Sequence, residues 1–329
     1  MRVRRPLALL FLALAAALAI GLVVVFRGGS SDPEGEAVAA ATTLAPPPAE
    51  TAAEPAPVST EEGPASLVYA EGAHDVAFEP RLSAPSYIAV DAATGRILIA
   101  RRERQRRPIA SLTKIMTALV VIEAGQLAGK AQVPAEAINV EPNREGLVKG
   151  RWYPRKLLLY SALMVSANDS AVTLAYDAGR GSVTRFYRLM NRKARQLGLT
   201  DTTYHDASGL NDEANVSSAR DQAILSRAAL ESPVFASVVR THRRLVDWPP
   251  PTYRKEWVNH NKMLVSYPGT YGVKTGYTTK AGGCLAVAVR RDGHTVIAVV
   301  LGSKHIWADM PRLVDEAFAR IGEGVEPLD

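Results

Sequence analysis

The sequence is poor in cysteine and has no grouped histidines. Its 329 residues include one cysteine, Cys284, so no disulfide can form within the chain. That cysteine begins an apolar run, Cys284–Val289, which predicts a buried and unreactive thiol. The six histidines form no His-x-x-x-His pair or other ligand cluster, so we expect no metal site and no cofactor. No nucleic-acid-binding motif is present, which argues against a nucleic-acid partner.

Basic residues are also absent between Arg27 and Arg81. Before this gap, three arginines within the first five residues precede an apolar run of 21 residues, Pro6–Phe26, long enough to cross the roughly 30 Å hydrocarbon core of a membrane. The positive-inside rule places everything after Phe26 outside the cytoplasm. Residues 1–27 are therefore expected to be a retained membrane anchor. A cleaved signal peptide is the alternative, although Gly28–Ser31 is a poor cleavage site.

Residues 28–65 are rich in proline and alanine and contain seven acids but no base. Such a segment cannot bury enough apolar surface to fold, so we expect a disordered spacer with a reach of about 100 Å. The folded domain is expected at residues 66–329, which carry 35 basic and 26 acidic residues. A surface of this sign suits an anionic polymer partner such as a cell wall, and an ordinary solvated surface is the other interpretation.

The folded part alternates strand and helix patterns, with strands at both ends and helices between them. Expected strands are Tyr87–Val90, Arg96–Ala100, a short Gly272–Thr275, Cys284–Val289 and Thr295–Leu301. Expected helices are Ser111–Ala124, Leu157–Ala178, Val183–Leu197, Ala219–Leu230 and Met310–Ile321. This order predicts an α/β (α+β) fold, in which one antiparallel sheet is completed by both ends of the domain and a helical subdomain is inserted between them.

Three short motifs occur in a fixed order, and the first is Ser111-x-x-Lys114 at the start of an expected helix. The two side chains lie one turn apart on the same face, so the lysine amine can reach the serine oxygen. A serine hydroxyl is a weak nucleophile that needs a base, and burial can lower the pKa of a lysine enough to supply one. A helix cap and a surface charge would explain this pair equally well if it stood alone. However, the helix continues as an almost wholly apolar run, Ile115–Val121.

The second motif is Ser166-x-Asn168, two small polar residues after an apolar stretch, and the third is Lys274-Thr275-Gly276 on a strand. Ser166 could relay a proton and Asn168 could position a lysine or a substrate amide. The strand offers a cation, a hydroxyl and backbone groups to a peptide laid alongside it. Satisfied core polar residues are the alternative for the second motif. Serine-lysine, serine-asparagine and lysine-threonine-glycine motifs in this order are typical of penicillin-recognising enzymes.

With these motifs the chain resembles the D-alanyl-D-alanine carboxypeptidases, the low-molecular-mass penicillin-binding proteins, over residues 80–320. The resemblance also rests on Met190-Asn191, Leu197–Leu199, Ala207–Leu210, Ser218–Asp221, Asn259–Lys262 and Gly272–Thr278. It implies a serine β-lactamase/DD-peptidase-like fold, peptidoglycan stem peptides as substrates and β-lactams as inhibitors. It also implies that Ser111 attacks the peptide carbonyl and that Lys114 takes its proton. The implied oxyanion hole is made of the backbone amides of Ser111 and Tyr277. Ser166 would protonate the leaving amine, and Lys274 and Thr275 would steer the substrate carboxylate.

Two departures from the family pattern are visible. Many relatives carry a second β-rich domain and an amphipathic C-terminal anchor, for which the fifty or so residues after Gly276 are too few, so the N-terminal segment is expected to replace that anchor. Relatives also place an arginine where this chain has Ser303–Trp307, which shifts carboxylate recognition toward Lys274 or Lys304. The open alternatives are a DD-endopeptidase, a serine β-lactamase and a noncatalytic wall-binding module. The Glu-x-x-Leu-Asn run of class A β-lactamases is absent.

Overall fold

The structure is a computed structural model that describes residues 67–79 and 81–322, all within one compact unit, Ser59–Asp329. The expected anchor at residues 1–27 and the expected spacer at 28–65 lie outside the described residues. Within the described ranges, no helix combines the length and apolar character needed to cross a bilayer.

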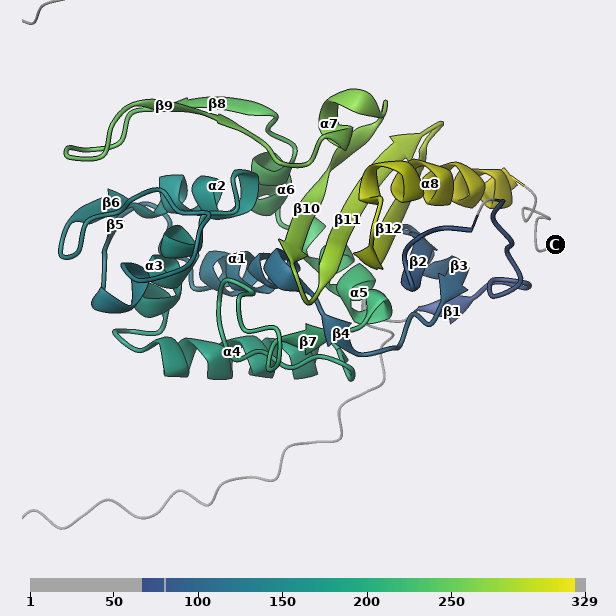
Figure 1. Cartoon of the computed structure of the whole chain (residues 1–329), viewed down its shortest axis with the longest axis horizontal. Coiled ribbons are helices and arrows are strands. Elements are labelled where there is room, and N and C mark those ends of the chain that lie inside the picture. Colours follow the sequence, from purple (N-terminus) through teal and green to yellow (C-terminus); the bar gives the residue numbers. More distant parts are fainter. Residues whose placement is uncertain (1–66, 80, 323–329) are drawn as a thin grey trace, which may run out of the picture. The chain divides into compact units, whose positions relative to one another are not determined.

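Six strands of the described chain form the central sheet, in the order β1-β3-β2-β12-β11-β10 (Figure 1). Their bounds are β1 Val68–Tyr69, β2 Ser86–Asp91, β3 Arg96–Arg101, β10 Thr270–Thr278, β11 Gly282–Arg291 and β12 His294–Ser303. The antiparallel pairing of β2 with β12 joins the two ends of the domain in one sheet, as the sequence predicts. The sheet is antiparallel from β3 to β10, as expected, and the short edge strand β1, which the sequence did not predict, pairs with β3 in parallel.

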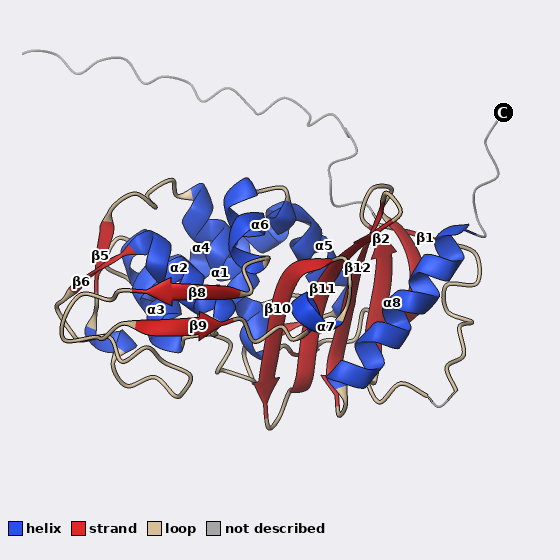
Figure 2. Cartoon of the chain, turned by 90° about the horizontal axis from the view of Figure 1, so that it is seen from above, coloured by secondary structure: helices blue, strands red, loops and turns tan. Residues whose placement is uncertain are grey.

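Both faces of the sheet are buried. Along β2, Tyr87 and Ala89 pack in one hydrophobic cluster and Ile88 and Val90 in the other, because successive strand residues face opposite ways. The last helix, α8 (Ile306–Gly322), covers one face and contacts β12, β11 and β2 (Figure 2). On the other face lies α5 (Ala219–Leu230), which packs on β12 and β2 and connects the sheet to the helical region.

The helical region is inserted between β3 and β10 and contains most of the helices in the described chain. Its helices are α1 Thr113–Glu123, α2 Arg155–Met164, α3 Asn168–Ala178, α4 Val183–Gln196, α5, α6 Pro233–Val239 and α7 Met263–Ser266, with short 3-10 turns η1 Ala110–Leu112 and η2 Ala135–Ala137. Three small ribbons accompany them: β4 Arg107–Pro108 with β7 Val216–Ser217, β5 Lys130–Gln132 with β6 Trp152–Pro154, and β8 Arg243–Val246 with β9 Lys255–Val258. Helix α1 is buried among α3, α4, α5 and α2.

One expected helix is wrong. The pattern Leu157–Ala178 predicts a single helix, but the chain forms α2 and α3 with a break at Val165–Ala167. The physical reason is the backbone of Ser166, which has a φ of 61° and so cannot continue a right-handed helix. The expected short strand Gly272–Thr275 is also wrong in length, because β10 runs over nine residues. Cys284 is buried, as expected, and burial raises the pKa of its thiol to about 11.

Candidate active site

The three sequence motifs meet where the helical region joins the edge strand β10. Ser111 lies in the 3-10 turn Ala110–Leu112, which leads directly into α1. Gly276 of β10 lies against that turn: a Cβ atom placed on it would be 2.9 Å from the Ser111 nitrogen and 3.1 Å from the Ile109 oxygen. Only glycine lets the strand come this close to the nucleophile turn, which explains the glycine of the third motif.

Lys114 is the centre of the site, with its side chain completely buried. Its Nζ lies 2.9 Å from Ser111 Oγ, 2.7 Å from Asn168 Oδ1 and 2.6 Å from the backbone oxygen of Ser208. A neutral amine has two N–H donors and one lone pair. It can therefore donate to the two carbonyl oxygens and keep the lone pair for the hydroxyl proton of Ser111.

The electrostatic environment favours that neutral form. Burial lowers the pKa of Lys114 to about 7, against the opposing influence of Asp206 and Asp169, whose negative charges favour the ammonium. Neither carboxylate is a hydrogen-bond partner of the amine, whose partners are Ser111, Asn168 and Ser208. Lys114 thus has the proton affinity of a general base that works near neutral pH.

Ser166 lies in the break between α2 and α3, and Asn168 begins α3; the side chains of both contact lysines. Asn168 accepts from Lys114 through Oδ1 and donates through Nδ2 to the backbone oxygen of Glu141, at 2.9 Å, so both ends of its amide are fixed. Ser166 Oγ accepts from Lys274 Nζ at 3.1 Å. The second motif therefore contacts both lysines, one through each of its polar side chains.

Lys274 is 1% exposed and its Nζ also donates to the backbone oxygen of Thr275, at 2.7 Å. Burial lowers its pKa well below the usual lysine value, and the nearby positive charge of Lys114 lowers it further. The sequence predicts direct contact between Lys274 and the substrate carboxylate. Its amine lies next to Ser166 and Thr275, and both of these residues line the pocket described below.

A pocket of about 390 Å³ opens over Ser111. It is lined by Ser111, Pro142, Asn143, Ser166, Asn168, Leu210, His260, Thr275, Gly276, Tyr277, Ile306 and Trp307. Six of these were candidates from the sequence, and the Tyr277 side chain at the rim is 73% exposed. A second hollow of about 440 Å³ shares Tyr277, Ile306 and Trp307 with the pocket and adds Lys304 and His305. The two hollows therefore adjoin at these shared residues, of which Tyr277 belongs to β10.

Sequence reasoning missed His260 and Ser208. His260 lines the pocket, and burial lowers the pKa of its imidazole, with smaller contributions from the charges of Lys274 and Lys114. It lies in Asn259–Lys262, a stretch that carried the family resemblance without an assigned role. The signal for Ser208 is turn chemistry: Asp206 accepts from the backbone nitrogens of Ser208 and Gly209, at 2.6 and 2.5 Å. That turn points the Ser208 carbonyl at Lys114.

Comparison with known proteins finds D-alanyl-D-alanine carboxypeptidases by both family model and sequence identity. A family model described as D-alanyl-D-alanine carboxypeptidase matches residues 73–305. The D-alanyl-D-alanine carboxypeptidase DacF of Bacillus subtilis is 32% identical over 246 residues, which are 72% of this chain and 62% of that protein. The carboxypeptidase DacB2 of Mycobacterium tuberculosis is 32% identical over 244 residues, covering 72% of this chain and 82% of the relative.

Two further comparisons bear on the type of reaction. A D-alanyl-D-alanine endopeptidase of Escherichia coli is 31% identical over 252 residues, covering 72% of this chain and 78% of that protein. The crystal structure of the Streptomyces K15 DD-transpeptidase superposes with a TM-score of 0.70 at 31% identity, covering 74% of this chain and all of that one. The catalytic unit is therefore shared with proteins named for three related reactions.

We predict that acylation of Ser111 by penicillin rises with pH through about 7. The neutral amine of Lys114 is the active form, so the rate falls as that amine is protonated below its pKa of about 7. At pH 6 the rate should be about a tenth of its plateau, measured by stopped-flow acylation. Lys114→Ala should lose acylation at every pH while keeping its melting temperature within a few degrees. An unchanged rate between pH 6 and 8 would assign the base to another group.

Proposed function

The chain belongs to the D-alanyl-D-alanine carboxypeptidase family of serine peptidases, and on that premise we propose that it removes the terminal D-alanine from peptidoglycan stem pentapeptides. The observation that carries the proposal is the contact of a buried lysine amine, Lys114 Nζ, with Ser111 Oγ at 2.9 Å, beneath an open pocket. A serine with its base in place at the floor of a cleft is the arrangement that acyl transfer needs.

The first half of the reaction forms an acyl-enzyme. Ser111 Oγ attacks the carbonyl between the two D-alanines as Lys114 takes its proton. The resulting oxyanion is stabilised by the backbone amides of Ser111 and Tyr277, which the close approach of Gly276 to the Ser111 turn brings near each other. The C–N bond then breaks, and Ser166 delivers a proton to the departing amine of D-alanine. Lys274, hydrogen-bonded to Ser166 Oγ, replaces that proton.

The second half releases the shortened peptide. Before this step Lys114 loses to solvent the proton that it took from Ser111, and Lys274 regains one, so both amines return to their starting states. Water then attacks the ester carbon, the neutral Lys114 accepts its proton, and the Ser111 oxygen leaves with that proton returned from Lys114. Asn168 holds Lys114 in place through both halves, because its amide is anchored at the other end by the Glu141 carbonyl. A β-lactam follows the first half and stops there, which accounts for its role as an inhibitor.

The free carboxylate of the substrate is bound next to Thr275. Thr275 stands at the pocket wall with the buried amine of Lys274 behind it, while Lys304 is exposed in the adjoining hollow. Trp307 occupies the mouth, with Lys262 Nζ 5.6 Å from the centre of its ring. Lys274 and Lys304 therefore provide the positive charge for carboxylate binding that an arginine near Ile306 provides in relatives.

An endopeptidase is the second candidate function, and the relative in Escherichia coli that bears this name is the observation in its favour. The chemistry at Ser111 is the same, and only the length of the leaving group differs. The hollow beyond Ile306 and Trp307 gives a longer leaving group or donor chain room to lie.

We also propose that residues 1–27 anchor the protein in the cell membrane, with the catalytic domain outside the cytoplasm. The support is the apolar run Pro6–Phe26 after a cluster of arginines and the position of the stem peptides, which lie outside the cytoplasm.

Product analysis decides between the two activities. Incubation with a stem pentapeptide is expected to release one D-alanine per peptide and leave a tetrapeptide, while cross-linked dimers should be cleaved more slowly. Ser111→Ala should abolish release and the single penicillin adduct seen by intact-mass measurement. Faster cleavage of dimers than of pentapeptide would move the assignment to an endopeptidase, and an adduct that survives in Ser111→Ala would overturn the nucleophile.

Replacing Lys274 by Ala should lower kcat/KM for the pentapeptide by about one to two orders of magnitude, because the lost attraction between this cation and the carboxylate is worth roughly 1.5–3 kcal/mol. A matched substrate with an amide in place of the free carboxylate should react slowly with the wild type and lose little more in the variant. An equal loss for both substrates would mean that Lys274 supports Ser166 instead of the carboxylate.

The anchor is tested by N-terminal sequencing of the protein recovered from native membranes. The expected mature chain retains residues 1–27 and sediments with the membrane fraction until detergent is added. A mature N-terminus between residues 28 and 45 would show that the segment is a cleaved signal peptide.

A further inference from the structure

Four arginines form a stripe along the outer face of α4, the helix at the lower edge of the described part in Figure 1. Arg185, Arg188, Arg192 and Arg195 are all exposed, and their spacing of three, four and three residues returns each to the same face. At 1.5 Å per residue the arginine stripe is about 15 Å long. The opposite face of α4 is apolar and buried through Phe186, Met190 and Ala194.

The stripe has no counter-charge among the described residues, since none of the four guanidinium groups has an acidic partner there. Three acids of neighbouring elements come near α4. Glu123 forms an ion pair with Lys193. Burial, followed by the negative charges of Asp206 and Glu136, raises the pKa of Tyr187, which the helical period places away from the stripe. The repulsion between neighbouring arginines therefore stays uncompensated, which works against the helix itself.

The position of Arg185 adds a second unfavourable feature. It lies in the first turn of α4, where the helix dipole favours an anion, and that turn contains no acid. Helix α4 does have a serine cap, since Ser182 Oγ accepts from the Arg185 nitrogen at 3.2 Å. The Ser182 cap therefore stabilises the N-terminus of α4, whereas the positive charge of Arg185 destabilises it. Such a conflict is expected where the arginines are present for binding rather than for folding.

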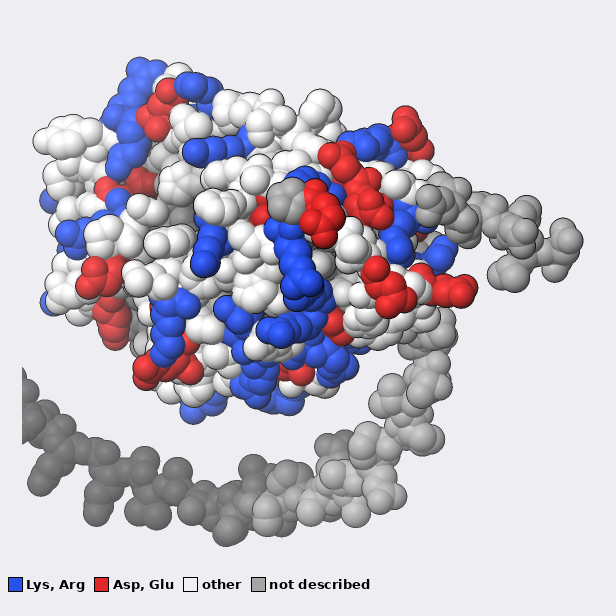
Figure 3. Space-filling model, turned by 45° about the vertical axis from the view of Figure 1, so that its right-hand side comes forward, with Lys and Arg blue, Asp and Glu red and all other residues white. Residues whose placement is uncertain are grey.

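The basic surface continues past the end of α4. Arg104 donates to Thr200 Oγ1 and Arg106 donates to Thr203 Oγ1, each at 3.1 Å, and both arginines are exposed. Figure 3, a view from another side, shows Lys and Arg gathered in the lower centre of that face with few acids among them.

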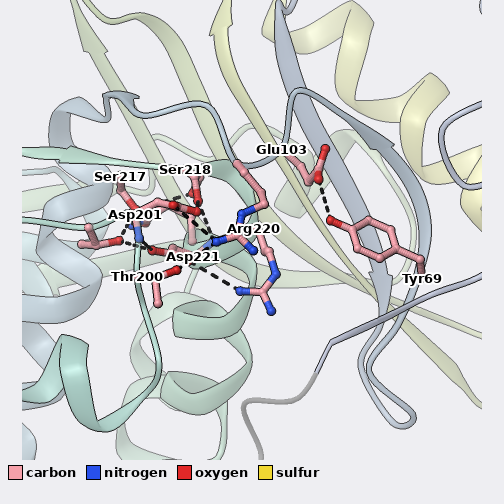
Figure 4. A network of polar contacts seen from close by, with 11 residues as sticks. Tyr69, Glu103, Thr200, Asp201, Ser217, Ser218, Arg220 and Asp221 are labelled. Atoms are coloured by element: carbon pink, nitrogen blue, oxygen red, sulfur yellow. Dashed lines mark hydrogen bonds and ion pairs between the residues drawn. The ribbon is translucent and has the colours of Figure 1, made fainter.

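The acids in this corner are largely engaged with other groups (Figure 4). Asp201 accepts from Ser218 Oγ at 3.1 Å, and Asp221 accepts from the backbone nitrogen of Asp201 at 2.8 Å. Asp201 also lies 3.6 Å from Arg104, so it compensates that arginine in part. It does not reach the stripe on α4, whose four arginines keep their charge available to a ligand.

We propose that the arginine stripe of α4 binds a water-soluble anionic polymer of the phosphodiester class. All four residues are arginine, whose planar fork matches the paired oxygens of a phosphate group better than the point charge of lysine does. A row of such groups about 15 Å long suits a chain of repeated phosphates rather than a single ion. This site lies outside the pocket over Ser111 and takes no part in the reaction there.

A membrane surface is the competing partner, and the apolar residues decide against it. A helix that lies on a lipid surface inserts an apolar face among the acyl chains. The apolar face of α4 is used in the core, and the large exposed hydrophobic residues of the described chain, such as Leu245 and Tyr253, lie on other elements. The stripe can therefore attract charge from water but has nothing to insert.

The test is a binding titration of the full-length protein in detergent with fluorescent poly(glycerol phosphate) at several salt concentrations. The variant R185Q/R188Q/R192Q/R195Q should bind at least tenfold more weakly, and the slope of log K against log salt should fall by about 3, as expected for four lost phosphate contacts. Penicillin acylation of Ser111 should stay unchanged, which shows that the variant is folded.

The matched control removes four exposed cations elsewhere, Lys130, Lys149, Arg151 and Lys156, around β5 and β6. This variant has the same net charge and should keep at least half of the wild-type affinity. Equal losses in both variants would overturn the proposal in favour of diffuse attraction by net charge. Binding of phosphatidylglycerol vesicles through the stripe without binding of the polymer would overturn it in favour of a membrane. Binding of neither would also overturn it and make the stripe an ordinary solvated helix face.

Discussion

The chemistry of the active site depends on keeping the amine of Lys114 buried away from water. Lys114 is completely buried, and burial lowers the pKa of its amine to about 7, whereas an exposed lysine would be an ammonium ion without a lone pair for Ser111. The fold provides this environment by surrounding α1 with α3, α4, α5 and α2. The helical region inserted into the sheet is thus the part of the fold that makes a base out of Lys114.

A carboxylate in contact with Lys114 would undo that effect, because an ion pair favours the charged amine. The site does contain two acids nearby, but both are engaged with backbone amides. Asp169 accepts from the nitrogens of Gly146 and Leu147, at 2.9 and 3.1 Å, and Asp206 accepts from those of Ser208 and Gly209. The acids therefore fix the loops that shape the site, and neutral carbonyl oxygens are left to face the amine.

The sequence predicts the elements whose signals are local. Helices α4 and α5 begin where expected because Ser182 and Ser218 cap them, each accepting a hydrogen bond from the backbone three residues on. The break at Ser166 could not be predicted, because the helical pattern continues on both sides of the polar residues Ser166 and Asn168. Its cause is tertiary: the Asn168 nitrogen donates to the Asn143 oxygen at 2.7 Å, so α3 starts anew against a distant loop. Likewise the ribbon of β8 and β9 is fixed by long-range contacts, among them Trp248 Nε1 donating to Glu145 at 2.8 Å.

The same distinction explains which site residues the sequence could provide. Ser111, Lys114 and Lys274 are chemically distinctive and occur in ordered motifs, so the residue types themselves indicate their chemistry. Ser208 acts through a backbone oxygen, which every residue has, so only the turn that aims it at Lys114 makes it a part of the site. Gly276 acts through the side chain it lacks, and the clash that any Cβ would make with the Ser111 turn exists only after β10 has paired with β11. Motifs thus identify the groups that react. The groups that position them depend on the tertiary fold, in which the two ends of the domain pair in one sheet, so the sequence alone does not identify them.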